Sequence, residues 1–404
     1  MKHRRLTALF LVCVFFLGGC APLDALLQYV SLPIYDAQKY QHEFTNRWEY
    51  QRLSNEDKHY YGQLYTAVTD TMATDTTVSL IGADGTTSSV PGVRVTLPGA
   101  TLSNAAIVRL YEAFYSDNPQ FFYLDRTYSL EGQQNPDGST YYNTITLQYT
   151  ADATQRGIMA AALQGIVDTL LADCPQTDDQ YVIEKHLHDR LNALCTYDMV
   201  AAESDIDTAP HAYTAYGALV EGKAVCEGYA KAMQLLLQKA SIPVTLVTGS
   251  VKETNESHMW NLITIHGENY HLDATWNDTN DQALHTFFNL TTDMVNVSYA
   301  IDDADTLPLC TAVADNFFVR ESTLVDTYER QIISQKIAER IQAGDTTIQL
   351  RFTDGKYENG VLFLKNKTLM TSMVNACLVD TSLSMWDYSL WADSQQQVLT
   401  LIKE

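Results

Sequence analysis

Basic residues are scarce in this chain of 404 residues, which carries 26 Lys and Arg against 49 Asp and Glu and a net charge of −23. Because like charges repel, nucleic acid and anionic membrane surfaces are poor electrostatic partners for it. A cationic substrate or a basic cell-wall component would suit this charge better, although acidity also serves solubility alone. The sequence has no Gly-rich phosphate loop, internal repeat, heptad pattern or low-complexity tract, so nothing in it indicates a nucleotide-binding loop, a solenoid or a coiled coil.

The apolar run at the start of the chain, LTALFLVCVFFL, has only 12 residues, which is too few to span a bilayer. It follows the basic MKHRR and precedes LGGC at 17–20, and together these segments resemble a bacterial lipoprotein signal. The resemblance implies cleavage before Cys20, acyl chains on its sulfur and amino group, and stable anchoring on the outer side of the cell membrane, because more than one chain is attached. An ordinary secretory signal with an accidental cysteine is the alternative. Loss of residues 1–19 would remove three basic residues and no acidic one, which brings the net charge to −26.

Cysteine is sparse, with seven residues in all. Cys13 would leave with the signal and Cys20 would be lipidated, so an odd number, five, remains. Two disulfides would leave one free thiol, and Cys226 would be that thiol if the bridges used Cys174, Cys195, Cys310 and Cys377. Their spacing establishes neither bridge, and buried reduced thiols fit the sequence equally well.

Residues 222–276 set a cysteine, a histidine and an aspartate in the order Cys226, His258, Asp273. A thiol is a strong nucleophile only as the thiolate, so it needs a base to take its proton and a third group to orient that base. The apolar spacing after Cys226 predicts a helix that runs to about Ala240. Cys226 is therefore expected at a helix N-terminus, where unpaired backbone N–H groups and the helix dipole favour an anion.

Two strands are predicted after this helix, HMWNLITI and YHLDATW, because both alternate apolar and polar residues with period 2. A two-residue turn at His266 and Gly267 would join them as a hairpin and set Asp273 opposite Trp260. His258 shares the sheet face of Trp260, so Asp273 and His258 become diagonal neighbours at about 7–8 Å between backbones. A turn with an odd number of residues would instead place Asp273 on the other face.

A family resemblance rests on three segments, AYGALVEGKAVCEGYAKA, SHMWNLITIHGENYHLDATWND and TFFNLTTD. Together they resemble the core of the transglutaminase-like superfamily over roughly residues 180–295, and CTYDM at 195–199 resembles the segment that ends the preceding helix. The resemblance implies a papain-like α+β core with Cys226 as nucleophile, His258 as general base and acid, and Asp273 as the carboxylate that orients the histidine. We expect no cofactor and no metal.

Other interpretations of these residues stay open at the sequence level. Free cysteine is often simply buried, and Cys, His and Asp are all zinc ligands, although no short ligand spacing such as C-x-x-C or H-E-x-x-H supports a metal site. His186 and His188 are interpreted as solvated surface residues of a helix, VIEKHLHDRLNAL, rather than as ligands.

The surroundings of the nucleophile are less defined by the sequence. Acyl transfer needs donors aimed at the developing oxyanion, and the backbone N–H of Cys226 is the first expected donor, while the second is unassigned. Trp260, Tyr229 and Tyr197 are weaker hypotheses for substrate contact, since an aromatic at these places is as often part of the packing.

The chain is expected to fold as α+β in two or three units after its signal. Helices are predicted near 104–116 and 153–172, with a strand pair around the NPDG turn at 135–138. The expected order is a signal peptide at 1–19, a tether that becomes helical at 20–55, an N-terminal α+β domain at 56–175, the catalytic core at 176–300 and a small α/β unit at 301–404.

Taken together, these features predict a lipid-anchored bacterial thiol enzyme that cleaves or transfers an amide, in a peptide or cell-wall peptide, through an acyl-enzyme on Cys226. Hydrolysis is favoured over crosslinking because Asp278, Asn280 and Asp281 lack the glycine and distal glutamate of a calcium loop. The alternatives are a protein-crosslinking transglutaminase and a non-catalytic surface module that keeps the fold.

Overall fold

The computed structural model describes residues 33–81, 86–204, 206–278, 284–380 and 382–404. The predicted signal peptide and Cys20 lie outside the described residues. Contacts divide the chain into two compact units, of which unit 1 comprises residues up to 173 with 214–221 and 234–245, and unit 2 comprises 174–213, 222–233 and 246–404. Helices and sheets occur in both, so the α+β class predicted from the sequence is confirmed. No helix among the described residues is long and apolar enough to cross a membrane.

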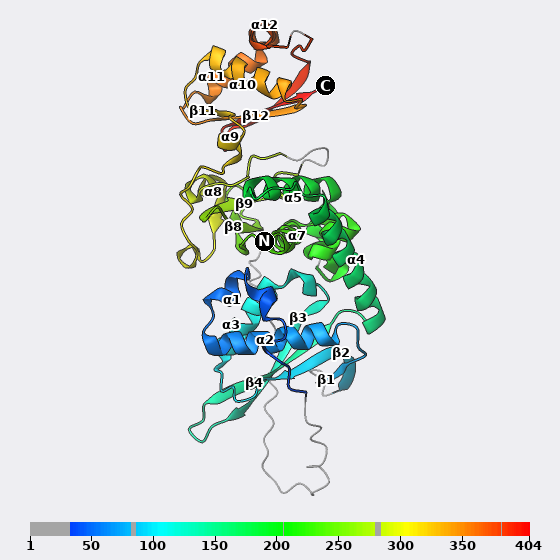
Figure 1. Cartoon of the computed structure of the whole chain (residues 1–404). Coiled ribbons are helices and arrows are strands. Elements are labelled where there is room, and N and C mark those ends of the chain that lie inside the picture. The colour runs from blue at the N-terminus through cyan, green and yellow to red at the C-terminus, as the bar shows by residue number, and fades with distance from the viewer. Residues whose placement is uncertain (1–32, 82–85, 205, 279–283, 381) are drawn as a thin grey trace, which may run out of the picture. The chain divides into compact units, whose positions relative to one another are not determined.

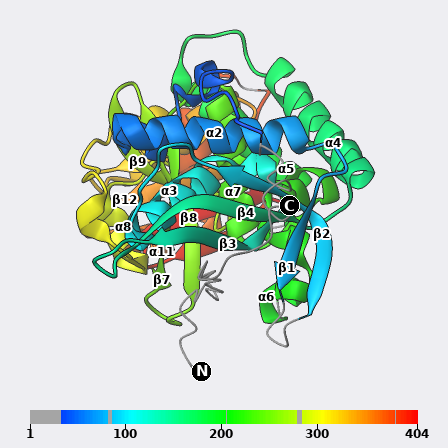
Figure 2. The same cartoon turned by 90° about the horizontal axis from the view of Figure 1, so that it is seen from below.

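Unit 1 is built on a four-stranded antiparallel sheet in the order β1-β2-β4-β3. Helices α2 and α3 lie beside one another across this sheet (Figures 1 and 2), and a serine hydroxyl caps each of them, as expected for an N-cap. The strand pair around the NPDG turn is present. The bounds are α1 (Trp48–Arg52), α2 (Asn55–Thr71), β1 (Thr77–Ile81), β2 (Thr87–Thr96), α3 (Asn104–Asp117), β3 (Leu124–Gln134), β4 (Thr140–Tyr149) and α4 (Ala153–Ala172).

The segment expected to be a tether that becomes helical is helical in places within its described part, but it is packed rather than loose. Residues 41–44 and 48–52 form short helical segments, and Phe44 and Tyr50 are buried. Their rings pack edge to face on Tyr61 of α2. The aromatic side chains therefore make this part of the chain a packed piece of unit 1, because burying them removes apolar surface from water.

The core of unit 2 pairs helices with a four-stranded sheet in the order β10-β7-β8-β9. The predicted hairpin register is present: Ile265 pairs with Glu268, and His266 and Gly267 take positive φ values of 50° and 86°, as a tight hairpin turn requires. The bounds are α5 (Gln180–Leu194), β5 (Thr196–Tyr197), α6 (Met199–Glu203), β6 (Lys223–Ala224), α7 (Cys226–Lys239), β7 (Val244–Val251), β8 (Ser257–Ile265), β9 (Glu268–Leu272), α8 (Thr292–Ser298) and β10 (Tyr299–Ile301). The part of α7 from residue 234 onward and the first two residues of β7 belong to unit 1.

The C-terminal part of unit 2 is a second sheet with helices against it, in the order β11-β12-β14-β13. Only β11 and β12 run parallel. Residues 357–365 and 367–377 form two separate helices, and the Asn366 side chain caps the second. The bounds are α9 (Phe317–Arg320), β11 (Leu324–Val325), α10 (Arg330–Gln342), β12 (Thr347–Phe352), α11 (Tyr357–Lys365), α12 (Lys367–Cys377), β13 (Tyr388–Asp393) and β14 (Val398–Lys403).

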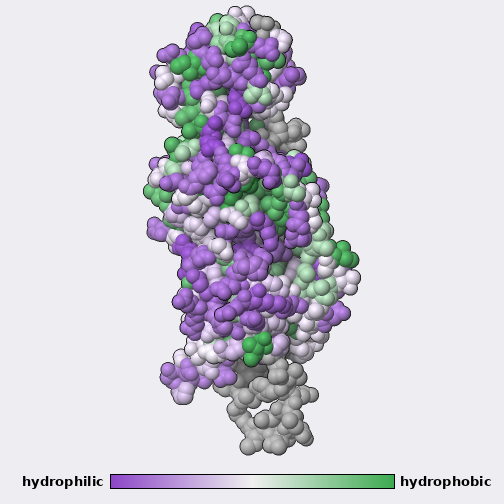
Figure 3. Space-filling model, viewed as in Figure 1, coloured by the Kyte–Doolittle hydropathy of each residue, from purple (hydrophilic) through white to green (hydrophobic). Residues whose placement is uncertain are grey.

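The cysteines and the surface agree with the composition. None of the five described cysteines forms a disulfide bond, and Cys195, Cys310 and Cys377 are buried. Of the two alternatives that the sequence left open, the structure agrees with reduced cysteines rather than with two disulfides. The face of the molecule in view in Figure 3 is mainly hydrophilic, as the high content of acidic residues leads one to expect.

Candidate active site

Three secondary-structure elements of unit 2 bring Cys226, His258 and Asp273 together. Cys226 is the first residue of α7 and is partly exposed. His258 lies in β8 and Asp273 directly follows β9, and both side chains are buried. Asn261 Nδ2 of β8 donates to the backbone oxygen of Ala230 in α7 at 3.0 Å, which ties the histidine's strand to the cysteine's helix.

The histidine interacts with both other residues. Its Nε2 lies 2.7 Å from Oδ2 of Asp273, and the side chain of Cys226 is near enough to raise the pKa of the ring. Since Nε2 faces the carboxylate, Nδ1 is the nitrogen that meets the thiol. This chain of contacts is the arrangement in which an imidazole can take a proton from sulfur while a carboxylate holds the ring.

Four donors satisfy the Asp273 carboxylate. Oδ1 accepts from the backbone N–H groups of Thr275 at 2.9 Å and Trp276 at 3.3 Å. Oδ2 accepts from His258 and from the hydroxyl of Tyr299, the latter at 2.6 Å. Asp273 can stay ionised although it is buried, because a carboxylate with several donors keeps its charge at little cost.

The pKa shifts follow from this arrangement. Burial alone would lower the pKa of His258, but the charge and hydrogen bond of Asp273, with the hydrogen bond to Cys226, outweigh burial and raise it above 6.5. Burial alone would raise the pKa of Asp273, yet His258, Tyr299 and the backbone of Trp276 lower it below 3.8. Both shifts favour a carboxylate facing an imidazolium, which is the state that stabilises a neighbouring thiolate.

Two of the three aromatics predicted to contact substrate are part of the packing instead. Trp260 is 1% exposed and Tyr229 is 0% exposed, so neither offers surface to a substrate. Trp260 stacks on His258 with ring centroids 5.8 Å apart and donates to Nδ1 of His271. Tyr229 donates to the carboxylate of Asp278.

Tyr197 lies near the nucleophile, and Trp276 lies beside the histidine. Tyr197 pairs with Ala224, two residues before Cys226. Burial, followed by the negative charges of Cys226 and Glu256, raises the pKa of Tyr197 to about 12. Trp276 is 48% exposed, and its ring centroid lies 6.4 Å from that of His258. The sequence suggested Tyr197, whereas the exposure of Trp276 in the DATW segment was not anticipated.

His188, Asp189 and His285 form a second cluster, whose potential ligand atoms lie within 4.8 Å of one another. His188 is completely buried, whereas His186 is half-buried. The prediction of a solvated surface position was therefore wrong for His188. The reason is that His188 packs against His285 and Phe288. Both lie about 100 positions later in the chain, so the sequence gives no sign of the contact.

Hydrogen bonds decide what this cluster can do. Oδ1 of Asn277 accepts from the backbone N–H of Phe287, so its Nδ2 donates to Nε2 of His188 at 3.1 Å. Nδ1 of His188 must then carry the proton that it shares with Asp189 Oδ1 at 3.0 Å. A metal ion needs a lone pair at that nitrogen, and the cluster is therefore best explained as a hydrogen-bonding network.

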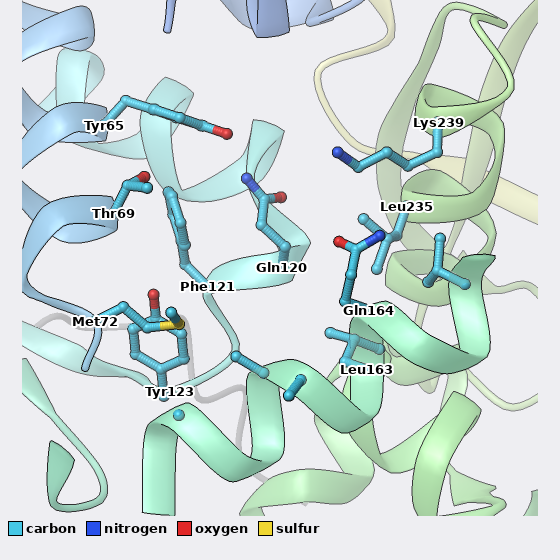
Figure 4. Close-up of a pocket in the computed structure, with 14 residues that line it drawn as sticks. Tyr65, Thr69, Met72, Gln120, Phe121, Tyr123, Leu163, Gln164, Leu235 and Lys239 are labelled. Carbon is cyan, nitrogen blue, oxygen red and sulfur yellow. The ribbon is translucent and has the colours of Figure 1, made fainter. Parts of the chain in front are cut away.

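A cavity of about 360 Å³ lies in unit 1, and neither the Cys226 site nor the His188 cluster contributes a side chain to its lining. Its walls come from α2, α4, the segment 120–123 and the end of α7. Figure 4 shows the hydroxyl of Tyr65 and the amine of Lys239 pointing into it from opposite sides. Its volume suits a small ligand, and no cysteine is among the described residues that line it.

Tyr299 is the main residue of the site that sequence reasoning missed. It follows Asp273 by 26 positions and begins a three-residue strand, β10. The motif ends before it, and a single tyrosine at that distance gives no periodic or spacing signal. Only the pairing of β10 with β7 brings it to the carboxylate.

Comparisons with known proteins agree with the motif. Residues 176–274 match the family model described as the transglutaminase-like superfamily. A search of curated proteins finds no match.

Solved structures similar to the chain include a TGase, with 13% identity and a TM-score of 0.25 over 37% of this chain and 44% of its own. A candidate cysteine protease from Cytophaga hutchinsonii has 17% identity and a TM-score of 0.24, over 38% of this chain and 64% of its own. A candidate protease from Parabacteroides distasonis has 14% identity and a TM-score of 0.19, over 35% and 30%. The chain thus spans less than two thirds of each. Residues 176–274, which carry Cys226, His258 and Asp273, belong to the transglutaminase-like superfamily.

Proposed function

We propose that the protein is a thiol enzyme that cleaves an amide bond through an acyl-enzyme on Cys226. The observation that carries this proposal is the position of the partly exposed Cys226 beside His258, whose ring hydrogen-bonds the buried Asp273. A merely structural cysteine needs neither a histidine at its sulfur nor a fully satisfied carboxylate behind that histidine.

Acylation begins when Nδ1 of His258 takes the thiol proton and the sulfur attacks the carbonyl carbon of the amide. The negative oxygen of the tetrahedral intermediate is met by backbone N–H groups, of which that of Cys226 is well placed, because the first N–H groups of a helix have no intrahelical partner. Collapse of the intermediate breaks the C–N bond, and the imidazolium gives its proton to the leaving amine. The products of this half are a thioester on Cys226 and a free amine.

Deacylation uses the same groups in reverse. His258 takes a proton from an incoming water, the resulting hydroxide attacks the thioester carbonyl, and the sulfur leaves as thiolate with a carboxylic acid as product. Asp273 stays ionised throughout and stabilises the imidazolium. An amine in place of water would give a crosslink.

We favour water as the acceptor. An amine competes only where a shaped site raises its effective concentration, and nothing in the sequence of residues 180–295 marks such a site. Asp278, which follows the triad carboxylate, accepts from Tyr229 and is thereby committed to packing. The proposed substrate is a peptide or cell-wall peptide at the outer surface of a bacterial membrane, to which the chain would be anchored through Cys20.

Product analysis tests this function. A library of peptide amides and cell-wall peptides is incubated with the protein and a fluorescent primary amine, and free acids are separated from amine-linked products. We expect free acid to exceed the amine adduct, and Cys226→Ala to form neither. An excess of amine-linked product would make the protein a crosslinking enzyme, and turnover by Cys226→Ala would exclude the thiol mechanism.

A further inference from the structure

The hydroxyl of Tyr299 shares one oxygen of Asp273 with the catalytic histidine. It donates to Oδ2 at 2.6 Å, while His258 lies 2.7 Å from the same atom. Tyr299 is 0% exposed, so it has no surface for substrate. We propose that Tyr299 is a positioning residue for the Asp273–His258 pair and that the C-terminal part of unit 2 holds it there. This inference rests on the thiol chemistry proposed above.

The ring of Tyr299 is fixed by its neighbours on several sides. Its centroid lies 4.9 Å from those of His258 and Trp260, and it stacks on Phe287 at 5.6 Å with an interplanar angle of 15°. A hydroxyl on a ring held in this way has one position. It therefore limits rotation of the Asp273 carboxylate, whose Oδ2 must stay within hydrogen-bonding distance of Nε2 of His258 for the triad to work.

Phe287 is also hydrogen-bonded to the backbone of Asp273. Its oxygen accepts from the N–H of Asp273 at 3.0 Å, and its own N–H donates to Asn277. The segment at 286–287 is in turn held from the C-terminal sheet, since Arg351 of β12 donates to the backbone oxygen of Thr286 at 2.5 Å. Arg351 is 2% exposed, which makes this contact a buried charge-assisted hydrogen bond.

A second contact from the C-terminal sheet reaches the residue before Tyr299. Gln396, in the turn between β13 and β14, donates through Nε2 to Oγ of Ser298 at 3.0 Å and to the backbone oxygen of Met294 at 3.3 Å. Both acceptors belong to α8, which ends where β10 begins. Gln396 is 6% exposed, and leaving its buried amide group unpaired would be costly.

The C-terminal part therefore hydrogen-bonds to both elements that fix the tyrosine, which are the segment at 286–287 and the end of α8. Its contacts lie outside residues 176–274, which match the family model. This assigns to residues 323–404 a role in catalysis, namely to set the distance between the Asp273 carboxylate and the His258 ring.

The test measures how fast iodoacetamide alkylates Cys226 in the full chain, with peptide mapping to separate it from the other cysteines. Tyr299→Phe removes only the hydroxyl, and Tyr270→Phe is the matched control, because Tyr270 is equally buried and its hydroxyl accepts from the backbone of Asp315 instead. We expect Tyr299→Phe to slow alkylation at pH 6 about tenfold, in line with the loss of a hydrogen bond to a charged group. At pH 9.5 the rates should converge, since a thiol then ionises without help from an imidazolium.

Gln396→Ala extends the test to the C-terminal sheet, with Gln335→Ala as its control, because the side chain of Gln335 is exposed on α10 and bonds Glu339. Gln396→Ala should slow alkylation at pH 6, as Tyr299→Phe does. The fold-decrease in rate of the double variant should be smaller than the product of the fold-decreases of the two single variants.

The results distinguish a failure of the proposed thiol chemistry from a failure of the positioning role of Tyr299. If wild-type Cys226 reacts at pH 6 no faster than Cys174, the thiol chemistry itself is wrong. If the wild type reacts fast and Tyr299→Phe matches Tyr270→Phe, the positioning role is overturned. Should Tyr299→Phe not fold, as judged by circular dichroism, an unchanged rate in Gln396→Ala overturns it.

Discussion

Replacing Asp273 by asparagine is the change whose effect the hydrogen bonds define most closely. Oδ1 accepts from the N–H groups of Thr275 and Trp276, so the oxygen of the new amide must stay there. The NH₂ group then takes the place of Oδ2, between His258 and Tyr299. It can donate one proton to Nε2 of His258 and the other to the tyrosine oxygen, so only the hydroxyl proton of Tyr299 loses its acceptor.

This exchange fixes the wrong tautomer. With Nε2 as acceptor, the proton of His258 moves to Nδ1, which faces Cys226 and can no longer accept the thiol proton. An amide in place of a triad carboxylate costs about 10⁴-fold in a serine protease for the same reason. We expect a loss of about 10³–10⁴-fold here, which corresponds to roughly 4–5.5 kcal/mol of barrier.

The assay is acylation by p-nitrophenyl acetate, a generic acyl donor whose leaving group is followed by absorbance. The rate for Cys226→Ala is subtracted as background. Asp273→Asn should keep the circular dichroism spectrum of the wild type, because its hydrogen bonds remain paired, and should release p-nitrophenolate at close to the background rate. Nitrogen NMR of the histidine rings should find the proton of His258 on Nδ1.

Acylation within a factor of about three of the wild type, in a folded variant, would refute this reasoning. It would mean that Asp273 does not orient His258. A loss of rate together with a proton still on Nε2 would refute the tautomer argument and leave only an electrostatic role for the carboxylate.

Two further predictions concern stability and location. Glu184 is completely buried, and burial, with the charge of Asp315, raises its pKa although Asn289 donates to it; ionisation of such a carboxyl destabilises the fold as the pH rises above about 4.3. Glu184→Gln should therefore raise the melting temperature at pH 8 and change it little at pH 4, and an equal shift at both would contradict the assignment. Cys20→Ala should release the protein from the membrane fraction or leave its precursor uncleaved, and a processed variant that stays bound would place the anchor elsewhere.

The local geometry of the site could be predicted because it depends on short-range rules. A two-residue turn at His266 and Gly267 fixes the parity of the hairpin, and parity alone places Asp273 and His258 on one face. The helix that starts at Cys226 follows from apolar spacing over a few turns. Both predictions match the structure.

The remaining features depend on contacts between distant segments. Tyr299 reaches Asp273 only through the pairing of β10 with β7, and His188 is buried through contacts with the distant residues Asn277 and His285. Neither contact leaves a periodic pattern in the sequence. Trp260 and Tyr229 show a related difficulty, since an aromatic beside a nucleophile can line a cleft or fill a core, and here both are buried.

The central claim is that Cys226 is the nucleophile and that His258 activates it. The most direct measurement locates the acyl group after brief reaction with p-nitrophenyl acetate at pH 6, by acid quenching and mass spectrometry of the peptides. Cys174 is the internal reference, because it is partly exposed like Cys226. We predict that the acyl group is found on Cys226 far ahead of Cys174 and that His258→Ala abolishes this preference. Equal labelling of the two cysteines in the wild type, or a preference for Cys226 that survives in His258→Ala, would contradict the claim.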